Sequence, residues 1–265
     1  MKLLTLNCHS WQEEKQLDKI KYLAQVISKK NYDVIALQEV SQSISSKTIK
    51  DSIKEDNFAV LLKKELDKIS KERYEFYWDF SHIGYDVYEE GLALMSRHKF
   101  LNNESFFITK GEDRNYWKTR KIVKSSIEIE GKVFDFYSCH LGWWNDEEEP
   151  FKYQADKLIE KIDDNIHSII MGDFNNNAFI KNEGYDYLLS KNLIDLYLQS
   201  GNECDEFSVT AEGKIDGWEE NREKLRLDLV LSNKSINVTE AKVIFNGTNK
   251  EIVSDHYGVE VKIEL

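Results

Sequence analysis

The chain has 265 residues, of which 41% are hydrophobic, enough for one large core or two small ones. Its formal net charge of −12 repels polyanions and counts against a nucleic-acid partner, although it does not exclude a local basic cleft. One proline and 12 glycines leave no hinge-like linker, and neither a low-complexity tract nor a repeat divides the chain. We therefore predict a single domain over residues 1–265.

The cysteines and the apolar runs indicate the cellular compartment of the protein. Cys8, Cys139 and Cys204 are an odd, widely separated set, and two of them lie in strand-like apolar segments where a reduced cysteine packs as a small hydrophobe. The first residues do not resemble a signal peptide, and no apolar run approaches the length of a membrane span. The sequence favours a cytoplasmic protein with no stable membrane association.

Hydrophobic periodicity predicts many strands and few helices. In chain order, we predict a strand at 2–7, a helix at 13–30, a strand at 33–38, a charged and roughly helical segment at 47–71, strands at 73–80, 91–96, 100–108, 122–129 and 133–140, a helix from 147, a strand at 169–171, a helix at 184–191, and strands at 227–231, 236–245 and 257–263. This pattern is typical of two packed sheets with helices outside, a four-layer α/β/β/α sandwich.

Two of the predicted helices have defined apolar stripes or ends. In the first, helical spacing places Leu17, Ile20, Ala24 and Ile27 on one buried face. In the helix from 147, three glutamates and Pro150 would occupy the first turn, where the helix dipole favours anions and proline needs no donor.

The segment after residue 168 combines a buried strand with an abrupt polar end. Apolar residues 169–171 run into Gly172-Asp173-Phe174-Asn175, where Gly172 allows close backbone approach. Asp173 and Asn175 would then present a carboxylate and an amide at the lip of a sheet, an arrangement suited to a hydrated metal ion or a phosphoryl group. Taken alone, the segment is also typical of a strand end followed by turn residues.

Polar residues occupy the ends of other predicted strands as well. They are Asn7, Glu39, His140, Asp228, Asp255 and His256. Each one alone is typical of a cap or a surface group, but adjacent strands bring their ends together. A cluster with this many carboxylates requires neutralisation, which implies a divalent cation.

These segments resemble, in order, the motifs of the endonuclease/exonuclease/phosphatase superfamily, whose members have a DNase I-like four-layer fold. The matching segments are Leu6-Asn7, Leu37-Gln38-Glu39, Leu94-Met95-Ser96-Arg97, His140-Leu141, Gly172-Asp173-Phe174-Asn175, Arg226-Leu227-Asp228 and Ser254-Asp255-His256. The resemblance covers nearly the whole chain and implies phosphoester hydrolysis by in-line attack of water.

The resemblance also implies roles for the residues that carry chemistry. His256, oriented by Asp228, would activate the attacking water or anchor the phosphate. Asp173 would position that water, while Asn175 and His140 would stabilise charge on the phosphoryl oxygens.

By the same resemblance, Glu39 and Asn7 would hold Mg²⁺, and Asp255 would carry a second ion or steady the first. His9 stands where many family nucleases have an acidic residue, and imidazole is a softer ligand than carboxylate. Binding of Mg²⁺ could therefore be weaker, or Mn²⁺ favoured. Contact of His9 with substrate, or simple packing, are equally open alternatives.

Two stretches bear on the substrate. Trp143 and Trp144, which follow the predicted histidine strand, could stack on sugar faces, with Asn145 bonding hydroxyl groups, or could instead pack as a loop that anchors the next helix. Lys118 and Arg120 could form a phosphate-binding patch, or Lys118 and Lys121 could be ordinary charges flanking a strand. The tryptophan stretch and the segment 4–11 resemble a bacterial branch of the superfamily that includes maltose 6′-phosphate phosphatase.

The leading hypothesis is therefore a Mg²⁺-dependent phosphomonoesterase for a small sugar phosphate such as maltose 6′-phosphate. A nuclease or a sphingomyelinase-like phosphodiesterase is the alternative enzyme. A binding or regulatory module that has lost activity is the alternative outside enzymes.

Overall fold

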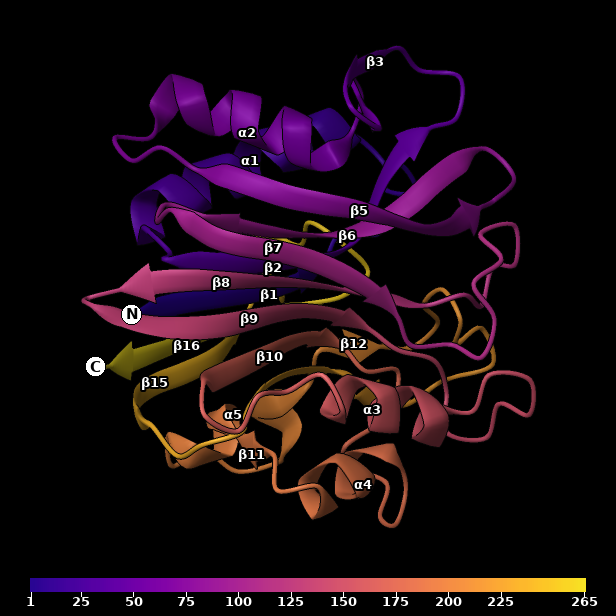
Figure 1. The fold of residues 1–265 in the computed structure, drawn as a ribbon, viewed down its shortest axis with the longest axis vertical. Helices are drawn as coiled ribbons and strands as arrows, with labels where there is room; N and C mark the ends of the chain where they lie inside the picture. The colour runs from indigo at the N-terminus through magenta and orange to yellow at the C-terminus, as the bar shows by residue number, and fades with distance from the viewer.

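Two six-stranded mixed sheets lie face to face in the computed structural model, which describes residues 1–265 (Figure 1). The first sheet has the order β15 (Asn237–Ile244), β16 (Gly258–Glu264), β1 (Lys2–Asn7), β2 (Val34–Ser43), β6 (Tyr88–Ser96) and β5 (Glu75–Gly84). The second has the order β11 (Ile194–Asp195), β14 (Asp228–Ser232), β10 (His167–Asp173), β9 (Lys132–His140), β8 (Lys121–Ile129) and β7 (Phe100–Phe107).

Helices cover the two outer faces. Helices α1 (Gln16–Lys30) and α2 (Phe58–Ile69) cover the first sheet, and α3 (Phe151–Ile159) and α4 (Gly184–Ser190) cover the second (Figure 1). The shorter elements are the hairpin of β3 (Thr48–Lys50) and β4 (Ile53–Lys54), helix α5 (Leu196–Gln199), the 3-10 turn η1 (Glu206–Ser208), and the hairpin of β12 (Ala211–Glu212) and β13 (Lys224–Leu225). The predicted four-layer sandwich is confirmed.

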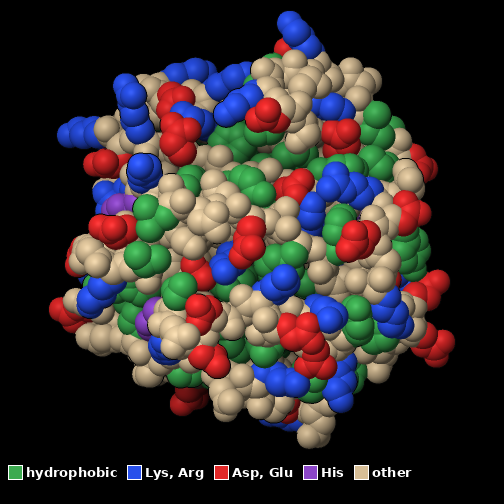
Figure 2. Space-filling view, in the orientation of Figure 1, with side chains coloured by type: hydrophobic (Ala, Val, Ile, Leu, Met, Phe, Trp, Pro, Cys, Tyr) green, Lys and Arg blue, Asp and Glu red, His purple; other side chains and the backbone are tan.

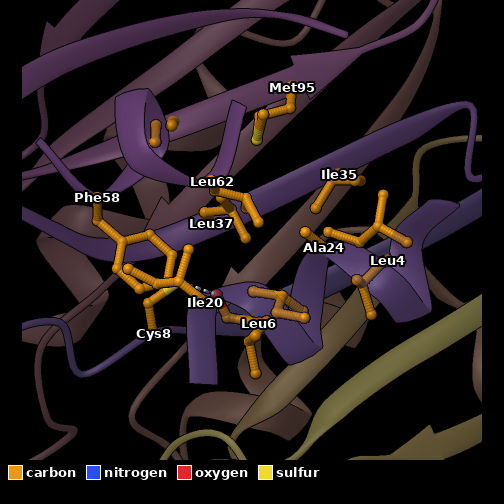
Figure 3. Packing of buried hydrophobic residues seen from close by; sticks show 14 of the residues in the cluster. Leu4, Leu6, Cys8, Ile20, Ala24, Ile35, Leu37, Phe58, Leu62 and Met95 are labelled. Carbon is orange, nitrogen blue, oxygen red and sulfur yellow. Dashed lines mark hydrogen bonds between the residues drawn. The ribbon is translucent and has the colours of Figure 1, made fainter. Parts of the chain in front are cut away.

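Alternation along the strands divides most of the buried apolar residues among three large cores. Leu4 and Leu6 of β1 pack with Ile20 and Ala24 of α1, in the layer that Figure 3 shows. Leu3, on the opposite face of β1, belongs to the core between the two sheets. A third core lies between the second sheet and its helices. Full burial of each such side chain contributes roughly 1.5–3 kcal/mol, so both faces of each sheet are firmly held.

Helix α1 differs from its prediction at the N-terminal end. It begins at Gln16, and Leu17 is 55% exposed, so the prediction of Leu17 in the buried stripe is wrong. The Gln16 side-chain oxygen accepts a hydrogen bond of 2.8 Å from the Trp11 amide, which holds Gln16 inside and turns Leu17 outward.

The segment 47–71 is only partly helical. Its first part forms the β3–β4 hairpin, and α2 begins at Phe58 because Asn57 caps it by accepting from the amides of Ala59 and Val60.

The helix predicted from 147 begins instead at Phe151, with Pro150 as its N-cap. Glu149 is held away from the helix because its carboxylate accepts hydrogen bonds from the amides of Lys110 and Gly111. The Asp146 carboxylate accepts hydrogen bonds from the backbone amides of Glu148 and Glu149, which form a separate bend before the helix.

Strands β5 and β6 run further than predicted and join in a tight hairpin. Tyr85 and Asp86 have φ of 51° and 59°, as expected in a two-residue turn that matches the twist of the strands. The polar residues of 82–90 lack an apolar alternation, which is why the sequence pattern ended both strands early.

Acidic and basic side chains are interspersed over the face drawn in Figure 2. No helix is both long enough and apolar enough to cross a membrane.

Candidate active site

Three polar side chains stand next to one another at one edge of the second sheet. Asp173 ends β10 and is the register partner of both His140, at the end of β9, and Asp228, at the start of β14. All three continue the alternate positions that face the first sheet, as Met171 and Val230 do in the core between the sheets. The strand register alone therefore gathers an imidazole and two carboxylates.

The first sheet contributes Asn7 and Glu39. Asn7 ends β1, and its Nδ2 donates to Glu39 Oε1 at 2.7 Å and to Asp173 Oδ2 at 3.1 Å. The second of these bonds joins the two sheets.

Glu39 reaches this position through a β-bulge. Leu37 and Val40 both pack under the helices, and the pairing of β2 with β6 shifts register between them. Glu39 is the extra residue, with φ of 50°, and simple alternation would have placed its side chain with that of Leu37. The bulge turns the carboxylate toward Asn7 instead, an unfavourable backbone conformation of the kind found at functional sites.

Gly172 makes the close approach that the sequence predicted. With φ of 151°, it lies so near β9 that a Cβ would be 1.9 Å from the carbonyl oxygen of Cys139. Asn175 follows with φ of 48°, and its amide donates to Asp173 Oδ1 at 2.8 Å. Its side-chain Oδ1 accepts from Trp218 Nε1 at 2.9 Å.

His256 and Asp228 form a buried pair. The His256 Nδ1 lies 2.8 Å from Asp228 Oδ2, and its Nε2 lies 3.7 Å from Asp173 Oδ2. Burial opposes protonation of His256, but the charges of Asp228 and Asp173 outweigh it and raise the pKa of the imidazole well above its usual value. Burial also raises the pKa of Asp228, to about 6, so the pair retains a proton at neutral pH.

His140 is the neutral member of the cluster. Its Nε2 lies 3.8 Å from Asp173 Oδ2 and 4.0 Å from Glu39 Oε1. Burial, and next the charge of Arg120, hold its pKa well below the usual value. A neutral imidazole here can donate a hydrogen bond without adding charge.

Carboxylates and imidazoles in this region could hold a divalent cation. Ligand atoms of Glu39, His140 and Asp173 lie within 4.8 Å of one another, as do those of His9, Glu39 and Asp216. Burial raises the pKa of Glu39, and the charges of Glu90 and Asp255 raise it further, so a cation would relieve an existing repulsion. This acidic cluster is a possible metal site.

His9 is engaged by acidic side chains in the structure. Its Nδ1 is 2.8 Å from Glu13 Oε1 and 3.6 Å from Asp255 Oδ1. Burial lowers the pKa of His9, but the bond to Glu13 and the charges of Asp255 and Glu39 overcome this and raise it to about 9. Ligand atoms of His9, Glu13 and Asp255 also lie within 4.8 Å of one another, so His9 belongs to two of the groups that could hold a cation. Asp255 lies outside the Glu39–His140–Asp173 group and also accepts from the Asp216 amide.

A pocket of about 500 Å³ opens beside the cluster. Its lining includes four residues of the strand-end cluster, which are Glu39, His140, Asp173 and Asn175. The other lining residues are His82, Gly84, Tyr85, Glu90, Trp117, Lys118, Arg120, Trp143, Asp146, Asp216, Gly217 and Glu219.

The predicted substrate residues separate into two groups. Trp143 lines the pocket, 5.9 Å from the ring of Trp117. Trp144 instead packs between Phe151 and Tyr187 in the helix-side core, outside the lining, and Asn145 is exposed outside it.

Both predicted basic residues line the pocket, in different states. Lys118 is paired with Asp146 at 2.7 Å and with Glu148 at 2.6 Å. Arg120 is 4% exposed and donates only to backbone carbonyl groups, those of Trp117 and Thr119.

The pocket also contains residues that no sequence motif marked. His82 and Glu90 come from the extended β5–β6 hairpin, and Asp216 and Glu219 from the loop between β12 and β13. The position of Glu90 could have indicated its role, because Glu90 pairs with Ser41, which lies two residues after Glu39. This inference would have required a prediction that β6 begins before Glu90.

Known proteins resemble this chain in sequence and in fold. The family model described as Endonuclease/Exonuclease/phosphatase family matches residues 4–256. A solved endonuclease/exonuclease/phosphatase family protein from Leptotrichia buccalis is 42% identical, with a TM-score of 0.93 and 100% of both chains covered. No curated protein matches the chain by sequence.

More distant structures share the fold alone. A mannosyl-6-phosphatase from Bacteroides thetaiotaomicron has 16% identity and a TM-score of 0.68, with 100% of both chains covered. TDP2 from D. rerio, complexed with a single-strand DNA product, has 14% identity and a TM-score of 0.69, with 100% of this chain and 99% of that chain covered.

Proposed function

Because the chain belongs to the Endonuclease/Exonuclease/phosphatase family, a family of phosphoester hydrolases, we propose that it is a metal-dependent phosphomonoesterase acting on a sugar phosphate. The proposed cation is Mg²⁺, with Mn²⁺ as the alternative.

The observation that carries this proposal is the state of Arg120. The guanidinium is buried, it bonds only to backbone carbonyl groups, and its Nε has no hydrogen-bond partner. A buried cation without a counter-ion is costly, and a phosphate group is a fitting partner for a guanidinium fork. Arg120 lines the same pocket as His140 and Asp173, so an anion bound there would lie beside the candidate catalytic groups.

The donor set fits a hard divalent cation. Glu39 and Asp173 offer carboxylate oxygens, and only the Asn7 amide now bridges them. The Asn7 Oδ1 accepts from the His9 amide at 3.1 Å, which fixes the orientation of this side chain. When bound, the cation would polarise the phosphoryl group and stabilise the leaving oxygen.

The remaining residues have roles that follow from their states. His256, held by Asp228 and protonated, donates to a phosphoryl oxygen and anchors it. Asp173 positions the attacking water and accepts its proton. His140 and the Asn175 side chain complete the set of groups around the phosphate. Water attacks phosphorus in line and the phosphoester bond breaks. The leaving sugar oxygen takes a proton from solvent water, and Asp173 returns to solvent the proton that it accepted.

The walls of the pocket favour a sugar over a polynucleotide. Trp143 and Trp117 offer aromatic surface, and Glu90, Asp216 and Glu219 offer carboxylates. Carboxylates bond readily to hydroxyl groups but repel the phosphates of a nucleic-acid strand.

The test is a phosphate-release screen with the purified chain over sugar phosphates, nucleotides and phosphodiesters, with Mg²⁺ or Mn²⁺. We expect kcat/KM for a sugar monophosphate to exceed that for every diester. Preferential cleavage of single-stranded DNA or of sphingomyelin would instead favour the phosphodiesterase alternative. Absence of hydrolysis with every substrate and metal would favour the non-enzyme alternative.

A further inference from the structure

The far end of the β5–β6 hairpin places two unassigned polar residues in the pocket. His82 and Glu90 are register partners across the two strands, and both line the pocket. Glu90 continues the face of Leu92 and Leu94, which points toward the second sheet. The register shift between Phe80 and His82 brings His82 to that face as well.

Both side chains are buried and make few hydrogen bonds. His82 is 5% exposed and its Nδ1 has no hydrogen-bond partner, while its Nε2 is 3.5 Å from Glu90 Oε1, too long for a good hydrogen bond. Glu90 is 8% exposed, and this separated contact with His82 is its only ion pair. Gly84 preserves the space around it, because a Cβ there would lie 3.0 Å from Glu90 Oε2.

Two further groups on the pocket wall share this state. Arg120 Nε and Trp143 Nε1 are also buried without a partner. Native proteins rarely leave buried polar atoms unsatisfied, and four unsatisfied or underused groups around one pocket point to a ligand that satisfies them.

The chemistry of these groups limits what that ligand is. Burial, and next the charge of Arg120, lower the pKa of His82 to about 3, so its ring is neutral and offers one donor and one acceptor. Glu90 offers acceptors or, when protonated, a donor as well. A hydroxyl group both donates and accepts, so adjacent hydroxyls satisfy this pair, whereas a second phosphate would meet the carboxylates of Glu90 and Asp216.

We propose that His82 and Glu90 form a hydroxyl-recognition subsite that selects a neutral polyhydroxy leaving group. This inference rests on the proposed phosphomonoesterase activity and assigns its specificity to the β5–β6 hairpin rather than to the strand ends that carry the chemistry. The aromatic face of Trp143 would complete the subsite.

The test compares His82→Ala and Glu90→Ala on two classes of substrate. The sugar substrates are glucose 6-phosphate, mannose 6-phosphate, maltose 6′-phosphate and monodeoxy analogues of the best of them, and the reference is p-nitrophenyl phosphate. A site that bonds a hydroxyl discriminates strongly against a ligand that lacks it. We expect each variant to lose about tenfold or more in kcat/KM on the best sugar phosphate and only about two- to threefold on the aryl phosphate.

The deoxy analogues supply a second readout. The wild-type chain should prefer the parent sugar to one monodeoxy analogue by about tenfold, and the variants should lose that preference. Glu89→Ala is the matched control, because Glu89 is the adjacent residue but bonds to Gln42 and Lys54 outside the pocket. If an alanine variant does not fold, Glu90→Gln or His82→Asn preserves polarity and replaces it.

The outcomes separate the two proposals. Hydrolysis of sugar phosphates with equal losses on sugar and aryl substrates, or with deoxy discrimination intact in the variants, would overturn the subsite and leave the proposed function standing. A wild-type chain that hydrolyses only diesters would overturn both.

Discussion

Glu90 illustrates how a single buried group can link the site to stability. Burial raises its pKa from 4.5 to about 7. Between these values the folded state binds more protons than the unfolded state, so the free energy of unfolding falls as pH rises through this window. Its contribution is fully present below pH 4.5 and is lost above the folded pKa, a difference of about 3 kcal/mol.

We therefore predict that Glu90→Gln stabilises the chain in alkaline buffer. In chelator, denaturant unfolding should give a gain of roughly 1–3 kcal/mol at pH 8 and less than about 1 kcal/mol at pH 5. An equal gain at both pH values would contradict the raised pKa. A stabilised variant with weaker sugar hydrolysis would be the expected exchange of stability for function.

Two residues separate the chemistry of the site from its binding. His256→Ala and Asp173→Asn should each lower kcat by about a hundredfold or more, because His256 stabilises the charge that grows on a phosphoryl oxygen in the transition state and Asp173 accepts the proton of water. Substrate KM should change much less. His167→Ala is the control, since His167 begins the same strand as Asp173 at its other end. Near-normal kcat in either site variant would remove the corresponding role.

At the scale of elements, the approach of β10 to β9 depends on Gly172. Gly172→Ala should lower the free energy of unfolding by about 2–4 kcal/mol, because its Cβ would overlap backbone atoms of Cys139. Gly131→Ala provides a comparison with positive φ alone, since its φ is 75° and no atom lies within 4 Å of its Cβ position. That variant should lose only about 1–2 kcal/mol in the same denaturant titration. Equal losses of stability in the two variants would show that the backbone conformation, and not the overlap with Cys139, makes glycine necessary at position 172.

The two tryptophans in the loop after β9 have different expected roles, substrate binding for Trp143 and packing for Trp144. Trp143→Ala should lower kcat/KM for a disaccharide phosphate several-fold more than for an aryl phosphate, because Trp143 lines the pocket. Trp144→Ala should instead destabilise the chain by about 2–3 kcal/mol through lost packing on Phe151 and Tyr187. Thermal unfolding and paired kinetics distinguish the two, and a selective loss of sugar hydrolysis in Trp144→Ala would contradict this division.

At the scale of the whole molecule, metal binding should be visible without any assay of activity. Mg²⁺ or Mn²⁺ at about a hundredfold excess over Kd should stabilise the wild-type chain by about 2.7 kcal/mol relative to chelator. Glu39→Gln should abolish most of this gain while leaving the metal-free stability similar or higher, because Glu39 is already repelled by Glu90 and Asp255. Full hydrolytic activity after exhaustive chelation would refute the metal assignment.

The layers of the molecule and the ends of its strands could be predicted because both depend on short-range patterns. The apolar periodicity predicted the strands of the two sheets, and polar residues at the strand ends marked Asp173 and Asp228 as candidates. In the structure, the strand register makes these two residues neighbours. Three features escaped prediction for physical reasons. The bulge at Glu39 breaks alternation, the hairpin around His82 and Glu90 carries no apolar period, and the loop with Asp216 meets the pocket only through long-range contacts.

The bond from Asn7 to Asp173 joins groups of the site that come from different sheets, and this affects when the site forms during folding. Asn7 and Glu39 come from one sheet, and His140, Asp173 and Asp228 from the other, so neither sheet alone contains a complete set of groups. A folding intermediate with one finished sheet would be inert, however native its strands. Catalytic competence should therefore arise in a single late step, when the sheets dock, and refolding followed by activity should lag behind refolding followed by circular dichroism.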